Sequence, residues 1–68
     1  MDIRQVVADN IRLIRQKRNL SQEALAAKSG VSISYIGYLE RAEKSISVVT
    51  LAKIAKALKV QPEELLRK

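Results

Sequence analysis

Apolar residues recur at helical spacing through most of the chain. Val7, Ile11 and Ile14 follow one another at steps of four and three, so they fall on one face of a helix. Runs that alternate between apolar and polar residues are too short to predict a strand. We therefore expect an all-α fold. The same helical period continues toward the C-terminal end, through Val48, Leu51, Ile54, Ala55 and Leu58.

Capping residues divide this pattern into successive helices. Asp2 and Ser21 are suited to begin the first and second helices, because their side-chain oxygens can accept hydrogen bonds from free backbone amides. Asn19 and Gly30 are suited to end the same two helices, because both tolerate the left-handed conformation. Ser32 is the expected cap of a third helix.

Two further helices are expected toward the C-terminus. Ser47, or alternatively Ser45, caps the fourth helix. Pro62 stands where the first position of a short fifth helix should be, and the two glutamates that follow it suit a helix N-terminus. We expect five helices that fold as one compact domain over residues 1–68.

The segment from about 21 to 41 has the features of a helix-turn-helix. Two helices are separated by a short turn that contains Gly30, as in this motif. Ala26 is small at the point where the second helix of the pair must cross the first. Ile36 and Leu39, three residues apart, can be buried against the first helix.

Charge indicates a polyanionic partner. The chain carries 13 lysines and arginines against 7 acidic residues, which gives a net charge of +6. Residues 1–20 hold five basic and two acidic residues (+3), residues 21–40 one and two (−1), and residues 41–68 seven and three (+4). A nearly neutral centre between basic flanks suits a DNA-reading element, or else a basic protein whose charges are simply solvated.

Composition argues against catalysis and against a membrane. The chain has no histidine, no cysteine and no glycine-rich phosphate loop, so the commonest general base and the thiolate nucleophile are missing. We expect no catalytic residue, metal, cofactor or small-molecule ligand. No apolar run approaches the roughly 20 residues of a membrane span. We therefore expect a cytoplasmic protein without a membrane partner, associated with the nucleoid if it binds DNA.

Several linked motifs resemble one family. The stretches "IRLIRQKRNLSQEALAAKSGVS", "YLER" and "LAKIAKALKV" are similar to the Cro/repressor-type helix-turn-helix family of phage and bacterial regulators. The similarity runs from about Ile11 to Leu66. The short chain, "YIGYLER" and the loop "AEKSIS" also resemble controller proteins of restriction–modification systems.

The resemblance implies a fold and a mechanism. The fold would be a compact five-helix, phage-repressor-like domain with the helix-turn-helix in helices 2 and 3. The protein would be a transcriptional regulator that binds double-stranded DNA sequence-specifically, as a homodimer on an inverted-repeat operator. The helix at about 32–40 would lie in the major groove. An alternative is a protein-interaction module, such as an antitoxin or accessory domain, for which DNA binding is secondary.

The resemblance also implies which residues read bases. These are Ile33, Ser34, Gly37 and Tyr38, which face outward from the buried side of the recognition helix. Ser34 can exchange a hydrogen bond with a base edge, whereas Ile33 can only make apolar contact, as with a thymine methyl group. Gly37 permits close approach of DNA, or is simply tolerated in the helix. Tyr38 can reach a base or a phosphate.

The implied phosphate contacts come from helix N-termini and basic side chains. Tyr35 is expected to pack its ring in the core with its hydroxyl near a phosphate. The implied set comprises Gln22, Ser32, Tyr35, Arg41 and Lys44, with Lys17, Arg18 and Lys28 as secondary members.

Two further sets are structural. Arg15 and Glu40 match family positions that form a buried ion pair between the first helix and the recognition helix. Possible dimer contacts come from Ile46, Val49 and the pair Leu65 and Leu66. We expect one leucine of that pair to close the monomer core and its neighbour to meet a second copy.

Overall fold

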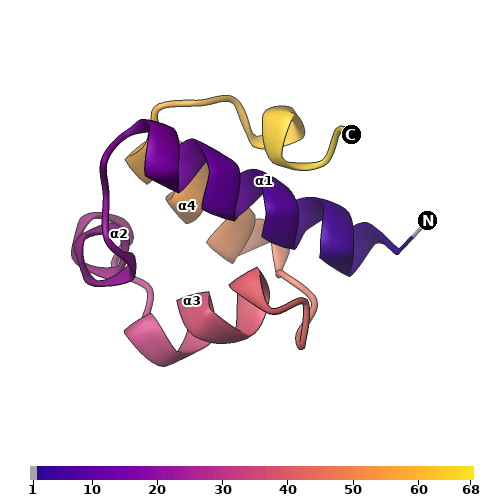
Figure 1. Ribbon diagram of the computed structural model, residues 1–68, viewed down its shortest axis with the longest axis horizontal. Coiled ribbons are helices and arrows are strands. Elements are labelled where there is room, and N and C mark those ends of the chain that lie inside the picture. Colours follow the sequence, from indigo (N-terminus) through magenta and orange to yellow (C-terminus); the bar gives the residue numbers. More distant parts are fainter. Residues whose placement is uncertain (1) are drawn as a thin grey trace.

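A computed structural model describes residues 2–68 and shows four α-helices and one short 3-10 helix (Figure 1). Helix α1 lies between α3 on one side and the 3-10 helix on the other, and α2 lies close to the C-terminal end of α1. No strand occurs among the described residues, and the all-α prediction is confirmed. The elements are α1 (Ile3–Lys17), α2 (Gln22–Ser29), α3 (Ile33–Glu40), α4 (Val48–Leu58) and η1 (Pro62–Leu65).

The predicted fifth helix begins at Pro62 but is a 3-10 helix, so the described residues form four α-helices and not five. Residues Pro62–Leu65 form a single 3-10 turn, closed by a bond from the Leu66 amide to the Glu63 carbonyl. The Asn10 side-chain amide in α1 donates to the carbonyls of Leu65 (2.9 Å) and Arg67 (2.7 Å) and so holds this C-terminal segment against α1.

Every helix contributes to one hydrophobic core. Leu25 and Ile36 join the two helices of the expected helix-turn-helix, and Leu65 closes the core from η1. Burial of each such side chain stabilises the fold by about 1.5–3 kcal/mol. The buried apolar cluster consists of Val7, Ile11, Leu25, Ile36, Leu39, Leu51, Ile54, Ala55, Leu58 and Leu65.

The predicted helix starts are confirmed. Asp2 accepts a hydrogen bond from the Arg4 amide, and Ser21 accepts one from the Ala24 amide. Ser32 and Ser47 cap α3 and α4 in the same way. Ser47 is therefore the cap of α4, not its alternative Ser45.

Each α-helix is followed within two residues by a residue in the left-handed conformation. Asn19 (φ +58°) and Gly30 (φ +74°) confirm the predicted ends of α1 and α2. Ala42 (φ +59°) and Lys59 (φ +62°) take the same conformation at the ends of α3 and α4, where no residue was predicted to end the helix. Ala42 reverses the chain, because its amide and the next one donate to carbonyls of the last turn of α3. Helix α3 thus stops sharply without a glycine.

Candidate nucleic-acid interface

Helix α3 presents a polar and an apolar group at its start. Ile36 and Leu39 anchor the helix in the core, and Ile33, Ser34 and Tyr38 are exposed on its outer side. Ser34 and Tyr38 are four residues apart and so share a face. The structure therefore brings three of the four predicted base contacts to one accessible surface.

Gly37, the fourth predicted base contact, is buried. A Cβ atom added to it would lie 3.0 Å from Nη1 of Arg41, whose guanidinium covers this part of α3. The glycine therefore makes room for an arginine of the same chain. The Arg41 side chain covers Gly37 in the free protein, and a base contact by Gly37 stays a prediction.

Tyr38 stands beside two cations. The Arg41 guanidinium carbon lies 5.3 Å from the centre of its ring, and the Lys44 ammonium 4.5 Å. Arg41 also forms an exposed ion pair with Glu43, with Nε to Oε2 at 3.1 Å, and this hydrogen bond raises the pKa of Arg41. The predicted phosphate ligands Arg41 and Lys44 thus both contact the Tyr38 ring at the C-terminal end of α3.

Tyr35 packs against the core as expected, but its hydroxyl has a partner in the chain. The hydroxyl donates to the carbonyl of Ser45 at 3.0 Å and so ties the loop after α3 to the helix. A tyrosine hydroxyl has one proton to donate. Contact with a phosphate oxygen would require this bond to break, so the predicted phosphate contact by Tyr35 does not fit the free protein.

Glu40 is where three helices meet. Its carboxylate accepts hydrogen bonds from Arg15 Nε at 2.6 Å and Nη2 at 3.0 Å, both from α1. The Gln22 side chain, at the start of α2, donates to the same carboxylate at 3.0 Å. The side chains of Arg15 and Glu40 are 13% and 4% exposed. The predicted buried ion pair is confirmed.

Two residues act here in ways that the sequence did not reveal. Gln22 donates one N–H of its side-chain amide to Glu40, and its backbone amide, in the first turn of α2, has no acceptor within the helix. Arg12 donates from Nη1 to the backbone carbonyl of Glu40 at 2.9 Å. Residues 28 positions apart carry no local signal for such a bond. Side chains of α1 therefore hold the end of α3 at two points, the carboxylate of Glu40 and its backbone carbonyl.

The secondary phosphate candidates lie in different places. Arg18 donates to the carbonyls of Leu58 (3.1 Å) and Lys59 (3.4 Å), where a cation suits the negative end of α4. Lys28 lines the same cleft, which includes no residue of α3 or of the loop after it. Arg18 and Lys28 therefore form a basic cluster apart from Tyr38. Lys17 is exposed on the last turn of α1.

The predicted dimer residues divide between core and surface. Leu65 is fully buried and closes the core, as expected of one member of this pair. Leu66 is exposed, and its contact with a second copy stays a prediction. Leu66 and Ile46 line an apolar groove of about 200 Å³. The structure adds Ile3 and Val48 to its walls, and Val48 is 82% exposed. Val49, also exposed, is the next residue of α4.

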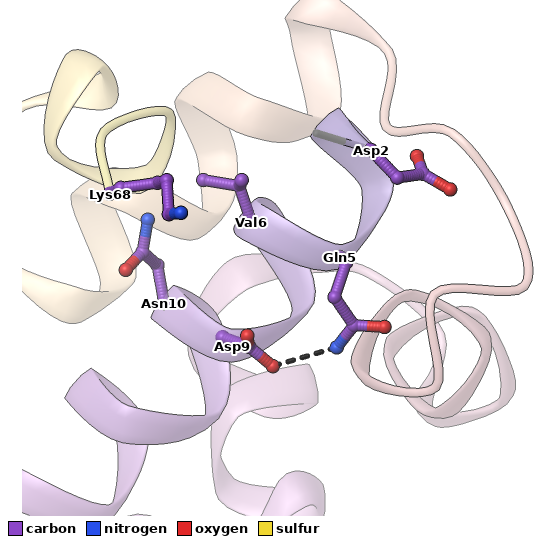
Figure 2. A pocket seen from close by; sticks show the side chains of 6 residues that line it. All are labelled: Asp2, Gln5, Val6, Asp9, Asn10 and Lys68. Atoms are coloured by element: carbon purple, nitrogen blue, oxygen red, sulfur yellow. Dashed lines mark hydrogen bonds between the residues drawn. The ribbon is translucent and has the colours of Figure 1, made fainter.

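A second hollow runs along the outer side of α1, between its N-terminal turns and the C-terminal residue (Figure 2). Its two carboxylates are both engaged, Asp2 with Arg4 and Asp9 with Gln5 and Arg12. Figure 2 shows the bond from Gln5 to Asp9. Because both carboxylates are already bonded to neighbouring side chains of the same segment, we assign this hollow no binding role.

Residues 2–68 contain no cluster of three or more acidic side chains that could hold a metal ion. Within the same range, no helix has the length and apolar character needed to cross a membrane.

Comparison with known proteins identifies a family. The sequence model of the helix-turn-helix family HTH_3 matches residues 11–65. Control protein C.SmaI of Serratia marcescens is 46% identical over 66 residues, which span 97% of this chain and 79% of that protein.

Two solved structures have the same fold. The restriction-modification controller protein C.AhdI from Aeromonas hydrophila superposes with a TM-score of 0.88 at 39% identity, over 91% of this chain and 94% of that one. The hypothetical transcription factor NHTF from Neisseria superposes with a TM-score of 0.93 at 38% identity, over 97% of this chain and 76% of that one.

Proposed function

Because the chain belongs to the HTH_3 family of helix-turn-helix DNA-binding transcriptional regulators, we propose that it binds an inverted-repeat operator as a homodimer, with α3 in the major groove of each half-site. Its similarity to C.SmaI and C.AhdI supports a role as the controller protein of a restriction–modification system. The single observation that carries the proposal is the outer face of α3, where Ile33, Ser34 and Tyr38 are exposed and the exposed cations Arg41 and Lys44 follow the helix.

In this arrangement, side chains in the first turn of α3 contact the bases. Side chains at the N-terminal end of a recognition helix meet base edges in this motif. Ser34 is exposed there and can donate to or accept from a base. Ile33 makes apolar contact with a thymine methyl group. With one polar and one apolar reader, each α3 specifies few positions, and the remaining specificity comes from the spacing of two half-sites.

Phosphate contacts orient the helix. The backbone amides at the start of α3, beside Ser32, and at the start of α2, beside Gln22, point their positive ends toward the strand. Arg41 and Lys44 add two cations at the other end of α3, and Lys17 is a further candidate. These contacts carry most of the affinity and make it depend on salt.

The dimer uses the apolar groove between the start of α1, the start of α4 and Leu66. Contiguous exposed apolar surface of this kind marks an interaction site. A second copy is the occupant that DNA geometry requires, because two recognition helices must lie about 34 Å apart on successive turns. Ile3, Ile46, Val48 and Val49 then contact the same patch on the other copy, as two-fold symmetry demands.

Two matched substitutions test this arrangement. Val48→Glu places a charge in the groove, whereas Leu13→Glu makes the same change at an exposed residue outside it. Both variants should fold, as judged by circular dichroism. Sedimentation should show a dimer for the original chain and for Leu13→Glu, and a monomer for Val48→Glu. The Val48→Glu variant should also lose its preference for a full inverted repeat over one half-site. A dimeric Val48→Glu variant would contradict the proposed interface.

A further inference from the structure

The end of α3 concentrates positive charge around one aromatic ring. Arg41 and Lys44 both lie over Tyr38, at 5.3 Å and 4.5 Å from the ring centre. Each is attracted by the ring, but the two cations repel each other. The Glu43 carboxylate supplies an anion beside this group, with its Oε2 at 3.1 Å from Arg41 Nε.

The backbone builds this arrangement. Ala42 reverses the chain in the left-handed conformation, and the Glu43 amide then donates to the Tyr38 carbonyl at 2.9 Å. This bond fixes the start of the loop beside the ring. Gly37 leaves the space that the Arg41 guanidinium occupies, since a side chain there would lie 3.0 Å from Nη1. The sequence therefore provides both the position of the cations and the room for them.

A carboxylate and a phosphate are interchangeable partners for a guanidinium. Both accept charge-assisted hydrogen bonds from its N–H groups. Glu43 is half exposed, so its side chain is free to swing away when a stronger or closer anion arrives. The loop also lies at the end of the helix proposed to enter the groove, where the DNA backbone passes.

We propose that Tyr38 is a positioning residue whose ring holds Arg41 and Lys44 as a clamp for one DNA phosphate, and that Glu43 occupies the place of this phosphate in the free protein. The inference rests on the proposed function and assigns Tyr38 a role other than base reading. The aromatic ring holds the two cations, and the hydroxyl group is not required for this. On binding, the phosphate replaces the Glu43 carboxylate as the anion beside Arg41.

The first test separates the ring from the hydroxyl. Tyr38→Phe keeps the ring, and Tyr38→Leu removes it. Binding is measured by fluorescence anisotropy on the preferred duplex and on its single-base variants. Tyr38→Phe should bind within about twofold of the original chain, whereas Tyr38→Leu should lose about three- to tenfold, as expected for a lost surface cation–π site. That loss should be uniform across the base variants, and most of it should disappear in an Arg41→Gln background.

The second test concerns the carboxylate. Glu43→Gln removes the anion beside Arg41, whereas Glu63→Gln makes the same change in net charge at an exposed residue of η1. Glu43→Gln should tighten binding about two- to fivefold more than Glu63→Gln does, in line with the strength of an exposed ion pair. In an Arg41→Gln background this difference should vanish.

Two results would overturn the clamp. One is a Tyr38→Phe variant that loses as much affinity as Tyr38→Leu and changes its preference at one base pair, because the hydroxyl would then read a base. The other is equal behaviour of Glu43→Gln and Glu63→Gln. Both results presuppose that the original chain binds a specific duplex. Absence of such binding would overturn the proposed function itself, and the clamp with it.

Discussion

Removal of the Glu40 carboxylate should have a large effect on stability. Glu40→Ala leaves the Arg15 guanidinium mostly buried with one remaining acceptor, the Leu20 carbonyl at 2.8 Å. Loss of one partner of a buried pair costs about 3–5 kcal/mol. At about 0.05–0.15 kcal/mol per residue, a chain of 68 residues has a total stability of roughly 3–10 kcal/mol. The variant should therefore lie close to its unfolding transition.

The assay is urea denaturation followed by far-ultraviolet circular dichroism. If Glu40→Ala is partly unfolded without urea, a stabilising osmolyte such as trimethylamine N-oxide supplies the folded baseline. Asp9→Ala is the matched control, because Asp9 forms an exposed pair with Arg12 at 2.9 Å. That variant should lose no more than about 1 kcal/mol.

A double variant isolates the interaction itself. Arg15→Met combined with Glu40→Leu replaces both charges by apolar side chains, so no unpaired charge stays buried. The pair should then be less destabilised than either single variant, with a coupling energy of about 2–3 kcal/mol. A loss below about 1 kcal/mol in Glu40→Ala, or additive single effects, would refute the argument that this pair links α1 to the recognition helix.

Three further predictions concern the helix ends and the chain terminus. Ala42→Gly should raise the free energy of unfolding by about 0.5–1 kcal/mol, because the left-handed cost for alanine exceeds the extra entropy of glycine. Gly30→Ala, with open space around the new methyl group, should do the opposite; equal signs in urea denaturation would contradict the conformational explanation. Hydrogen bonds from Arg4 hold the pKa of Asp2 below its ordinary value of 3.8, so its contribution is present above that pH and is lost as the pH falls through the lowered folded value. Asp2→Asn should therefore flatten the fall in stability below about pH 4, and an unchanged profile in urea titrations at several pH values would disprove it. Asn10→Ala should cost about 1–3 kcal/mol and raise amide exchange in η1, since two carbonyls lose their donor; unchanged exchange there would show that Asn10 does not hold the C-terminal segment.

Local rules predicted the helices well. Caps such as Ser21 and Ser32 act within a few residues, so their signal is fully contained in a short stretch of sequence. The helix ends at Asn19 and Gly30 were predicted for the same reason. Ala42 and Lys59 were not, because neither residue type favours the left-handed conformation and only the surrounding fold holds them there.

Contacts between distant residues were harder to predict. The pair formed by Arg15 and Glu40 was available only through family resemblance, since nothing local links the two positions. Nothing in the sequence pointed to the bond from Arg12 to the Glu40 carbonyl or to those from Asn10 to the C-terminal segment. Each of these arginine and asparagine side chains reads as a solvated residue of α1 until the helix is placed against its neighbours.

The candidate site shows the same division. Periodicity correctly placed Ile33, Ser34 and Tyr38 on the outer side of α3. The burial of Gly37 depends on the path of the Arg41 side chain, and the Tyr35 hydroxyl finds its partner ten residues away. The direction that such a side chain takes is decided by packing in the folded protein. The helical period predicts which face a residue lies on, but not this direction.

The most direct test of the central proposal is selection of bound DNA from a random duplex pool, with the selected duplexes titrated at two salt concentrations. The account predicts an inverted repeat whose half-sites lie about 34 Å apart, bound by two chains. Specific binding should weaken with salt but stay well above binding to random duplex. Recovery of no motif, with weak binding that disappears as salt rises, would leave only the charge attraction and contradict sequence recognition by α3.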